Sequence, residues 1–392
     1  MQEWVDLTDD IGPERVFHVY DPGVGMKGVV VVDSTIRGRA GGGTRMLSDI
    51  TTEEMLDLGR AMTHKFAILD IPIGGAKAGI WADPGMKGDK RKEILKAFGN
   101  AIKPLLENCV GIGADIGTDN DDVAMIYEGA GLPSGYTGLS LEEIDGEPLE
   151  NHATGYGVVV AAKAACEFAG IDIKGATVSI EGFGKVGGGV ARYMIEEGAK
   201  VVAISTIDGG IYDERGLDVK KLIEMRKDFG DKVVQKYPSV KQIDKRELFL
   251  LPVDILIPGA RPYVINGDNV HGIRAKIISS IANIPITNEA EDILSQRGII
   301  SVPDFISNAG GVVLGMIDNL GGTVDHVFNA LRTLISPLTK DILTEAGREK
   351  ITPRSLAVRK TREKVLRAQA GEDSGIPPGG RREHLKNIFN IH

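Results

Sequence analysis

Residues 177–187, Thr-Val-Ser-Ile-Glu-Gly-Phe-Gly-Lys-Val-Gly, indicate most clearly how this chain of 392 residues folds. Thr177–Ile180 has the length and composition of a buried strand, and the glycine-rich turn after it leads into a predicted helix. In such a turn Gly182 permits the tight bend, Gly184 lets the backbone approach a pyrophosphate, and Gly187 lets helix and strand pack closely. The helix N-terminus favours anions because its N–H groups are unpaired. The stretch therefore predicts a dinucleotide site.

We assign six consecutive residues of the turn to that site: Gly182, Phe183, Gly184, Lys185, Val186 and Gly187. A turn kept only for packing is the alternative, but the flanking strand and helix favour the nucleotide. The second strand of such a site often ends in an acid that binds the ribose of NAD. Here the sequence is Ser205-Thr206-Ile207-Asp208: no carboxylate stands at the expected tip, although Asp208 lies two residues on, and no arginine is there for a 2′-phosphate. The cofactor is therefore NAD or NADP, with NADP slightly favoured, and Thr206 is a candidate contact.

Strand and helix patterns alternate after residue 150. The expected strands are Thr177–Ile180, Lys200–Ile204, Asp254–Ile257, Lys276–Ile281 and Ile299–Val302. Alternation of this kind predicts a doubly wound parallel sheet with helices on both faces. From about residue 325 the pattern is mainly helical and ends in a basic, turn-rich stretch at residues 374–382.

The first 150 residues have a different pattern. Arg15–Tyr20 and Gly28–Asp33 predict two strands around a turn, and Gly38–Arg45 is expected to be a loop because it is so rich in glycine. Thr51-x-x-Glu54 is a capping box that predicts the start of a helix.

The helix after Thr51 should bury one apolar stripe, made of Met55, Leu58, Met62, Phe66 and Leu69. Lys65 falls beside Leu58 on a helical wheel and should point inward. His64 falls on the opposite face and should be solvated.

Lys77 has an unusual setting, since only glycine, alanine and isoleucine occur within three residues of it. Small neighbours let another molecule approach the ammonium, and burial lowers the pKa of a lysine towards that of a general base. The alternative is an exposed lysine in a glycine-rich turn.

Composition excludes several classes of protein. The net charge of −9 argues against binding to nucleic acid, and no apolar stretch is long enough to span a membrane. Cys109 and Cys166 lack metal-ligand spacing and are expected to be reduced thiols in the cytoplasm. We expect no metal site, because the histidines are scattered and Asp119–Asp122 is better suited to capping a helix.

Six motifs occur in order and together resemble the glutamate/leucine/phenylalanine/valine dehydrogenase family. They are Gly42-Gly43-Thr44-Arg45, Lys65, Gly74-Gly75-Ala76-Lys77, Asp115-Ile116-Gly117-Thr118, Ala153-Thr154-Gly155-Tyr156-Gly157-Val158 and Asn308-Ala309-Gly310-Gly311-Val312. The resemblance covers roughly residues 15–330. It implies an α/β chain of two domains with the active site in the cleft between them. The substrate domain would span residues 1–150, completed by helices of residues 326–392, and the nucleotide domain residues 151–325.

The resemblance also implies a reaction and the residues that perform it. The reaction is the NAD(P)-dependent, reversible oxidative deamination of an L-amino acid to a 2-oxo acid and ammonia. Lys65 would bind the substrate α-carboxylate, Lys77 would be the base that activates water, and Asp115 would move protons to and from the substrate nitrogen. Thr154 and Asn308 would contact the nicotinamide end, and Ala260 and Asn283 are further candidates for cofactor contact.

Two glycines bear on the substrate. Glutamate enzymes of the family have a lysine where this chain has Gly41 and a serine where it has Gly315. A carboxylate buried without these partners would cost several kcal/mol. We therefore expect a neutral aliphatic or aromatic amino acid, bound by Gly41, Gly42, Asn308, Val312 and Gly315.

Two other interpretations stay open. Residues 286–311 look closer to the glutamate branch, and Pro258–Pro262 departs from both branches, so Arg261 could supply a replacement cation or bind a cofactor phosphate. The chain would then be a glutamate dehydrogenase with a rearranged side-chain site. The last alternative is a dinucleotide-binding regulatory protein without turnover. A homo-oligomer (hexamer, octamer or dimer) is expected from the resemblance.

Overall fold

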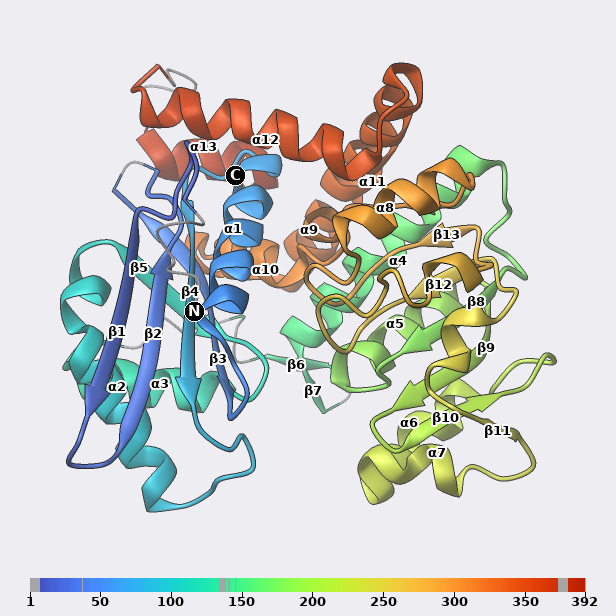
Figure 1. Cartoon of the computed structure of the whole chain (residues 1–392), viewed down its shortest axis with the longest axis horizontal. Coiled ribbons are helices and arrows are strands. Elements are labelled where there is room, and N and C mark those ends of the chain that lie inside the picture. Colours follow the sequence, from blue (N-terminus) through green and yellow to red (C-terminus); the bar gives the residue numbers. More distant parts are fainter. Residues whose placement is uncertain are drawn as a thin grey trace. The chain divides into compact units, whose positions relative to one another are not determined.

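The computed structural model describes residues 8–36, 38–133, 139, 142–144, 146–372 and 380–391. It forms two compact units, one of Met1–Leu141 with Val358–Ile388 and the other of Glu142–Ala357 with Phe389–Ile391 (Figure 1). The expected domain ranges stay predictions.

The first unit is built on a five-stranded sheet in the order β1-β2-β4-β3-β5. Its strands are β1 (Arg15–Asp21), β2 (Met26–Val32), β3 (Ala40–Leu47), β4 (Gly74–Trp81) and β5 (Val110–Ala114). β3 runs parallel to both β4 and β5, and β2 runs antiparallel to β1 and β4. The two N-terminal strands expected from the sequence are confirmed.

The expected loop at Gly38–Arg45 is wrong, because most of it is strand β3. A Cβ on Gly42 would lie 1.7 Å from the carbonyl oxygen of Ala76 on β4, and one on Gly41 would lie 3.3 Å from the ring of Phe66. The glycines are therefore needed for close packing around a central strand rather than for a turn.

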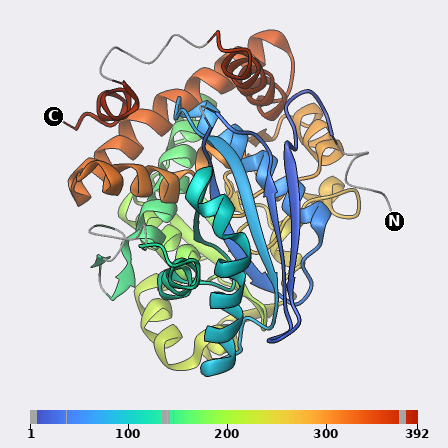
Figure 2. The ribbon, with the colours of Figure 1, turned by 90° about the vertical axis from the view of Figure 1, so that its left-hand side faces the viewer.

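Helices cover both faces of this sheet. α1 (Thr52–Ile68) packs on β4, β2 and β3, whereas α2 (Asp89–Asn108) packs on β1, β2 and β5 together with α3 (Asn120–Ala130) (Figure 2). The hydroxyl of Thr51 caps α1 as expected, accepting a hydrogen bond from the Glu54 N–H, and the apolar stripe of α1 is buried. The predicted cap at Asp119 of α3 is also confirmed.

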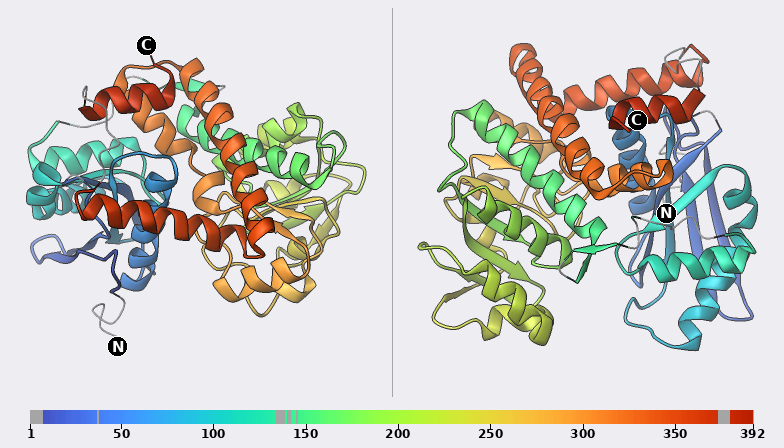
Figure 3. Two further views of the ribbon diagram at one scale, coloured as in Figure 1. Left: turned by 90° about the horizontal axis from the view of Figure 1, so that it is seen from above. Right: turned by 180° about the vertical axis from the view of Figure 1, so that it is seen from behind.

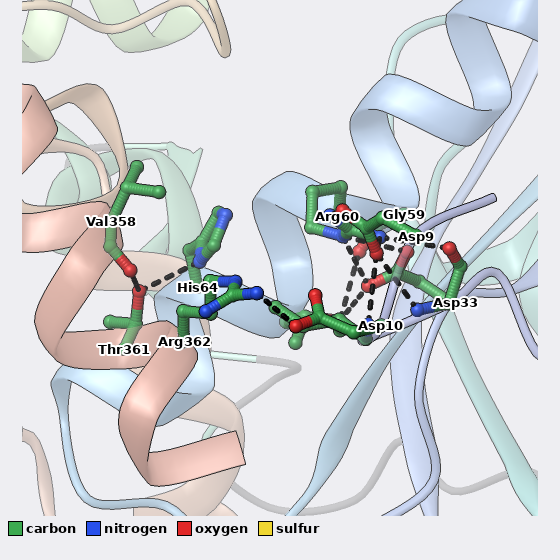
Figure 4. Close-up of polar contacts among 12 residues, drawn as sticks. Asp9, Asp10, Asp33, Gly59, Arg60, His64, Val358, Thr361 and Arg362 are labelled. Atoms are coloured by element: carbon green, nitrogen blue, oxygen red, sulfur yellow. Dashed lines mark hydrogen bonds and ion pairs between the residues drawn. The ribbon is translucent and has the colours of Figure 1, made fainter. Parts of the chain in front are cut away.

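His64 is not solvated, contrary to expectation: it is only 5% exposed. Its Nδ1 lies 2.7 Å from the hydroxyl of Thr361 on α12 (Pro353–Gln369), and Arg362 of the same helix pairs with Asp10 (Figure 4). A helical wheel of α1 could not show this, because a helix about 300 residues later in the chain covers the face. The last helix is α13 (Gly380–Phe389), and most of the basic stretch at 374–382 lies outside the described residues.

The second unit contains a seven-stranded sheet in the order β11-β10-β9-β8-β12-β13-β14. Its strands are β8 (Thr177–Glu181), β9 (Lys200–Thr206), β10 (Gly209–Tyr212), β11 (Lys241–Ile243), β12 (Ile255–Ile257), β13 (Ile277–Ile278) and β14 (Ile300–Ser301). The five expected strands are present and parallel, the last three being shorter than predicted. The antiparallel edge strands β10 and β11 were not predicted.

Helices and short segments complete the second unit. They are the hairpin β6 (Glu143–Ile144) and β7 (Glu147–Pro148), then α4 (Leu149–Ala169), α5 (Lys185–Glu196), α6 (Val219–Phe229), η3 (Gly230–Lys232), α7 (Val233–Lys236), η4 (Glu247–Leu250), η5 (Val270–Gly272), α8 (Asn288–Gln296), α9 (Asp304–Ser307), α10 (Gly310–Leu320) and α11 (Val324–Glu349). In Figure 3 the green α4 and the orange α11 lie side by side. The helical pattern expected after residue 325 is confirmed.

Two further observations concern composition. Both Cys109 and Cys166 are free and buried. Within the described ranges, no helix has the length and apolar character needed to cross a bilayer.

A buried charged cluster in the second unit involves Glu291 of α8. Arg354 pairs with Asp304, and its positive charge also acts on Glu291, which accepts a hydrogen bond from Ser301 at 3.2 Å. Burial raises the pKa of Glu291 from its ordinary 4.5 to about 7, although Arg354 and Ser301 act in the opposite direction. The folded state therefore binds this proton more tightly than the unfolded state.

We expect Glu291→Gln to remove a pH dependence of stability. In the native chain the Glu291 contribution is fully present below pH 4.5 and is lost as the pH rises towards 7, a change of about 3 kcal/mol. Urea unfolding at pH 5 and pH 8 should show that the variant gains stability relative to the native chain at the higher pH. Glu289→Gln, an exposed change on the same helix, is the control and should leave the difference unaltered. Equal pH dependence in the native chain and Glu291→Gln would contradict the prediction.

Candidate functional site

Lys77 lies in the middle of β4, between β2 and β3, and is not in a turn. Its side chain is only 3% exposed, which excludes the alternative of a solvated lysine. Its amine is 2.5 Å from Oδ2 of Asp115, the residue that follows β5. The structure thus brings together two residues that the sequence placed in separate motifs.

Gly43 of β3 explains how this pair fits into the sheet. A Cβ at that position would lie 2.9 Å from the Asp115 Cβ and 3.2 Å from the Lys77 Nζ. The backbone of Asp115 is also held, since its N–H donates to the Thr118 hydroxyl, which in turn donates to the Thr44 carbonyl oxygen. The pair therefore has a defined position before any ligand binds.

Burial and neighbouring charges determine the proton affinity of this pair. Burial lowers the pKa of Lys77 from its usual value; the Asp115 carboxylate opposes this, and the Arg45 guanidinium adds to it. Burial alone would raise the pKa of Asp115, but Lys77 and Arg45 hold it well below its usual range. A lysine whose pKa is lowered next to an ionised carboxylate gives up its proton more readily than a solvated lysine.

Arg45 and Glu54 also belong to this cluster, although no sequence pattern assigned either residue to it. Arg45 is 2% exposed, its Nε donates to Asp115 Oδ2 at 3.1 Å and its Nη1 donates to Glu54 Oε1 at 2.5 Å. The one available signal was that Arg45 ends the Gly-Gly-Thr-Arg motif. The capping-box pattern predicts instead that the Glu54 side chain binds the backbone N–H at the start of α1.

Lys65 lies on the buried side of α1 and is 5% exposed, so the inward orientation expected from the helical wheel is confirmed. Gly41 and Gly42 lie on β3. These three candidates and the Lys77–Asp115 pair all belong to the first unit.

The glycine turn of the second unit has the geometry that a dinucleotide requires. Gly182 has φ of +86°, which favours glycine, and a Cβ on Gly187 would lie 2.1 Å from the Gly182 carbonyl oxygen. A Cβ on Gly184 would meet nothing within 4 Å, so the backbone is open to a ligand there. Phe183 is buried, and α5 begins at Lys185 with its N-terminus towards the turn. These residues fit a bound pyrophosphate.

Asn308 provides a second sign of a ligand in this unit. It is 6% exposed. Its Nδ2 donates hydrogen bonds to the carbonyl oxygens of Ile281 and Ala282 and to the side-chain oxygen of Asn283. Its Oδ1 is buried and accepts no hydrogen bond from the part of the chain that is described. A fixed acceptor without a donor fits an amide group such as that of nicotinamide.

The motif of Thr154 meets the motif of Asn308 where α4 packs on α10. A Cβ on Gly310 would lie 2.1 Å from the Ala153 carbonyl oxygen, and one on Gly311 would lie 3.4 Å from the Thr154 hydroxyl. The two glycines of Asn-Ala-Gly-Gly therefore allow the helices to touch. Further along α10, Val312 is half-buried and a Cβ on Gly315 would meet nothing within 4 Å.

Two candidate cofactor contacts, Thr206 and Ala260, form hydrogen bonds with other groups of the protein. The Thr206 hydroxyl donates to the Asp231 carbonyl oxygen and accepts from the Asp208 N–H. The Ala260 N–H donates to Glu181 Oε2 at 2.7 Å, as does the Gly259 N–H at 2.8 Å. Glu181, which had no assigned role, thus ties the 259–260 loop to the glycine turn. Arg261 is exposed.

Comparison with known proteins identifies one family over most of the chain. The model described as "Glutamate/Leucine/Phenylalanine/Valine dehydrogenase" matches residues 146–372, and that of the "Glu/Leu/Phe/Val dehydrogenase, dimerisation domain" matches residues 13–130. A glutamate dehydrogenase of Thermotoga maritima is 35% identical over 367 residues, covering 90% of this chain and 87% of the relative. An NADP-specific glutamate dehydrogenase of Saccharolobus shibatae is 35% identical over 309 residues, covering 76% and 72%.

Two solved structures are similar over nearly the whole chain. The hetero-hexameric glutamate dehydrogenase from Thermus thermophilus in a leucine-bound form has a TM-score of 0.79 at 26% identity, covering 91% of this chain and 89% of that one. L-Tryptophan dehydrogenase from Nostoc punctiforme has a TM-score of 0.66 at 25% identity, covering 94% and 100%. The first of these proteins is named for glutamate and the second for tryptophan, so members with a similar fold are named for amino acids with different side chains.

Proposed function

The chain belongs to the glutamate/leucine/phenylalanine/valine dehydrogenase family and is an NAD(P)-dependent amino acid dehydrogenase, and on that premise we propose its substrate and the roles of its residues. The substrate is a neutral L-amino acid with an aliphatic or aromatic side chain. The products are the 2-oxo acid, ammonia and reduced cofactor. The reaction consumes one water and is reversible.

The role of each residue follows from its chemistry. Lys65 is a buried cation that binds the substrate α-carboxylate. A bound nicotinamide would supply the hydride acceptor, and a substrate that has given up the hydride of its α-carbon is an iminium. Lys77 then takes a proton from water as that water adds to the iminium carbon. Asp115, 2.5 Å from Lys77, carries protons to and from the substrate nitrogen as ammonia leaves.

Cofactor contacts are proposed for the second unit. Gly182, Phe183, Gly184, Lys185, Val186 and Gly187 surround the pyrophosphate at the N-terminus of α5. The Asn308 Oδ1 accepts from the nicotinamide amide, with Thr154 and Asn283 beside it. Thr206 and Ala260 shape the turn from inside. The NADP-specific relative supports the lean towards NADP, but NAD fits the same residues.

The observation that carries the substrate assignment is the environment of Gly41. A side chain there would start 3.3 Å from the aromatic ring of Phe66, and glycine itself brings no cation. At Gly315 of α10 there is likewise no hydroxyl to bind a side-chain carboxylate. A γ-carboxylate would lose the partners that compensate its desolvation. We propose that glycine at 41 and at 315, in place of a lysine and a serine, favours a substrate with a neutral side chain.

The test is a panel of L-amino acids assayed by the absorbance of reduced nicotinamide, with each cofactor in turn. We expect kcat/KM for the preferred neutral amino acid to exceed that for glutamate by at least about 100-fold. Gly41→Lys should raise relative activity on glutamate, whereas Gly41→Met, of similar length without the charge, should not.

Preference for glutamate by the native chain would support the second candidate, a glutamate dehydrogenase with a rearranged side-chain site. That candidate is favoured by the curated relatives and by Arg261 as a replacement cation. Cofactor binding without turnover of any amino acid would instead support a regulatory protein. We also propose a homo-oligomer, since a dimerisation-domain model matches residues 13–130 and the Thermus relative is a hexamer.

A further inference from the structure

Two cations share one carboxylate oxygen in the first unit. Asp115 Oδ2 is 2.5 Å from the Lys77 amine and accepts from the Arg45 Nε at 3.1 Å. The Arg45 guanidinium also donates to Glu54 from its Nη1. The four charged groups form a chain from Glu54 through Arg45 and Asp115 to Lys77.

Arginine and lysine have different functions in such a chain. An arginine in a protein keeps its proton, whereas a buried lysine can lose it. If Lys77 were the only counter-charge of Asp115, its deprotonation would leave a buried carboxylate unpaired, at high cost. Because Arg45 stays charged and bound to the same oxygen, Asp115 remains compensated when Lys77 gives up its proton.

We propose that Arg45, held by Glu54, is a positioning residue that supplies the permanent counter-charge of Asp115 and so frees Lys77 to cycle its proton. This inference rests on the proposed function, in which Lys77 is the base. Arg45 acts through Asp115 and need not touch the substrate. Glu54 orients the guanidinium, and its negative charge partly offsets the effect of the Arg45 charge on Lys77.

Other charged groups lie on the elements that pack against β4. α1 packs on β4 and carries Arg60, which is engaged with Asp9 and Asp33, and Lys65 on its buried side. Glu53 and Asp57 of α1 are exposed. The other neighbouring strand, β2, carries Lys27 as its single charged residue, and that lysine is exposed. Asp115, Arg45 and Glu54 are among the charges that act on Lys77.

Removing the cation and removing the anion beside Lys77 should shift its titration midpoint in opposite directions. Arg45→Met removes a cation beside Lys77, so the ammonium is favoured and its titration midpoint rises. Glu54→Gln keeps an acceptor for Arg45 but removes an anion, so the midpoint falls. Arg45→Lys keeps a cation and should stay nearest to the native midpoint. We expect shifts of about one pH unit for Arg45→Met and about half a unit for Glu54→Gln.

The direct measurement is the pH titration of the ¹³Cε resonance of Lys77 in lysine-labelled protein, assigned by its loss in Lys77→Arg. It needs neither cofactor nor substrate. The acid-side inflection of kcat/KM for deamination is the second readout and should move in the same direction as the NMR midpoint. A purely structural role for Arg45 would lower activity at every pH and leave both midpoints in place.

The outcomes separate the two proposals. If Arg45→Met and Glu54→Gln fail to move the Lys77 midpoint in opposite directions, the inference about Arg45 is wrong while the dehydrogenase function stands. If the NMR midpoints move as expected but the native chain oxidises no amino acid, Arg45 tunes Lys77 and the proposed function is wrong. Should Arg45→Met fail to fold by circular dichroism, Glu54→Gln decides, because it must still lower the midpoint.

Discussion

Replacing Lys77 with methionine is expected to lower kcat for oxidative deamination by roughly 10²–10⁴-fold while leaving the affinity for cofactor nearly unchanged. Methionine has similar length and no exchangeable proton. Asp115 keeps Arg45 as its partner in this variant, so the site should remain folded. Activity should be followed by nicotinamide absorbance, and cofactor affinity by the fluorescence of the reduced cofactor.

Lys77→Arg distinguishes a base from a simple positive charge. Arginine preserves the charge next to Asp115 but does not lose its proton near neutral pH. If Lys77 only held the substrate by its charge, this variant would keep much of the activity. We expect it to be as inactive as Lys77→Met; turnover above about a tenth of the native rate would contradict the role of Lys77 as base.

Replacing Gly42 with alanine is expected to destabilise the first unit by at least about 3 kcal/mol. The added Cβ would lie 1.7 Å from the Ala76 carbonyl oxygen. Both atoms belong to adjacent strands at the centre of the sheet, so no side chain can rotate to relieve the clash. Urea unfolding by circular dichroism should show a lower midpoint or no folded first unit.

Gly111→Ala is the matched control for this change. Gly111 lies on β5, which pairs with the same strand β3, and its added Cβ would meet nothing within 4 Å. Its stability should stay within about 0.5 kcal/mol of the native value. A similar unfolding midpoint for the two alanine variants would show that β3 does not approach β4 as closely as the structure has it.

The parts of the molecule that the sequence predicted are those in which the information is local. Gly182, Gly184 and Gly187 lie within six positions, and a strand and a helix flank them, so the turn and its ligand class follow from neighbours in the chain. The cap at Thr51 and the buried stripe of α1 are local for the same reason. The order of six motifs then identified the family.

The errors arose where a distant segment determines the outcome. Glycine alone indicates flexibility and so predicts a loop at Gly38–Arg45, but contact with β4 makes glycine the residue that a buried strand needs here. The position of His64 opposite the apolar stripe predicts a solvated side chain, but α12 covers that face.

By itself, the sequence determined the dinucleotide turn, the family, and Lys65, Lys77 and Asp115 as candidates. Only the tertiary structure showed that Arg45 and Glu54 join Lys77 and Asp115 in one charged cluster. Arg45 lies on β3 and Asp115 follows β5, 70 positions further along the chain. Periodicity and spacing report contacts within one helix or strand, whereas the pKa of a buried group depends on every charge within a few ångströms of it, whatever its position in the chain. The candidate base could therefore be predicted from its motif, and the groups that tune it only from the fold.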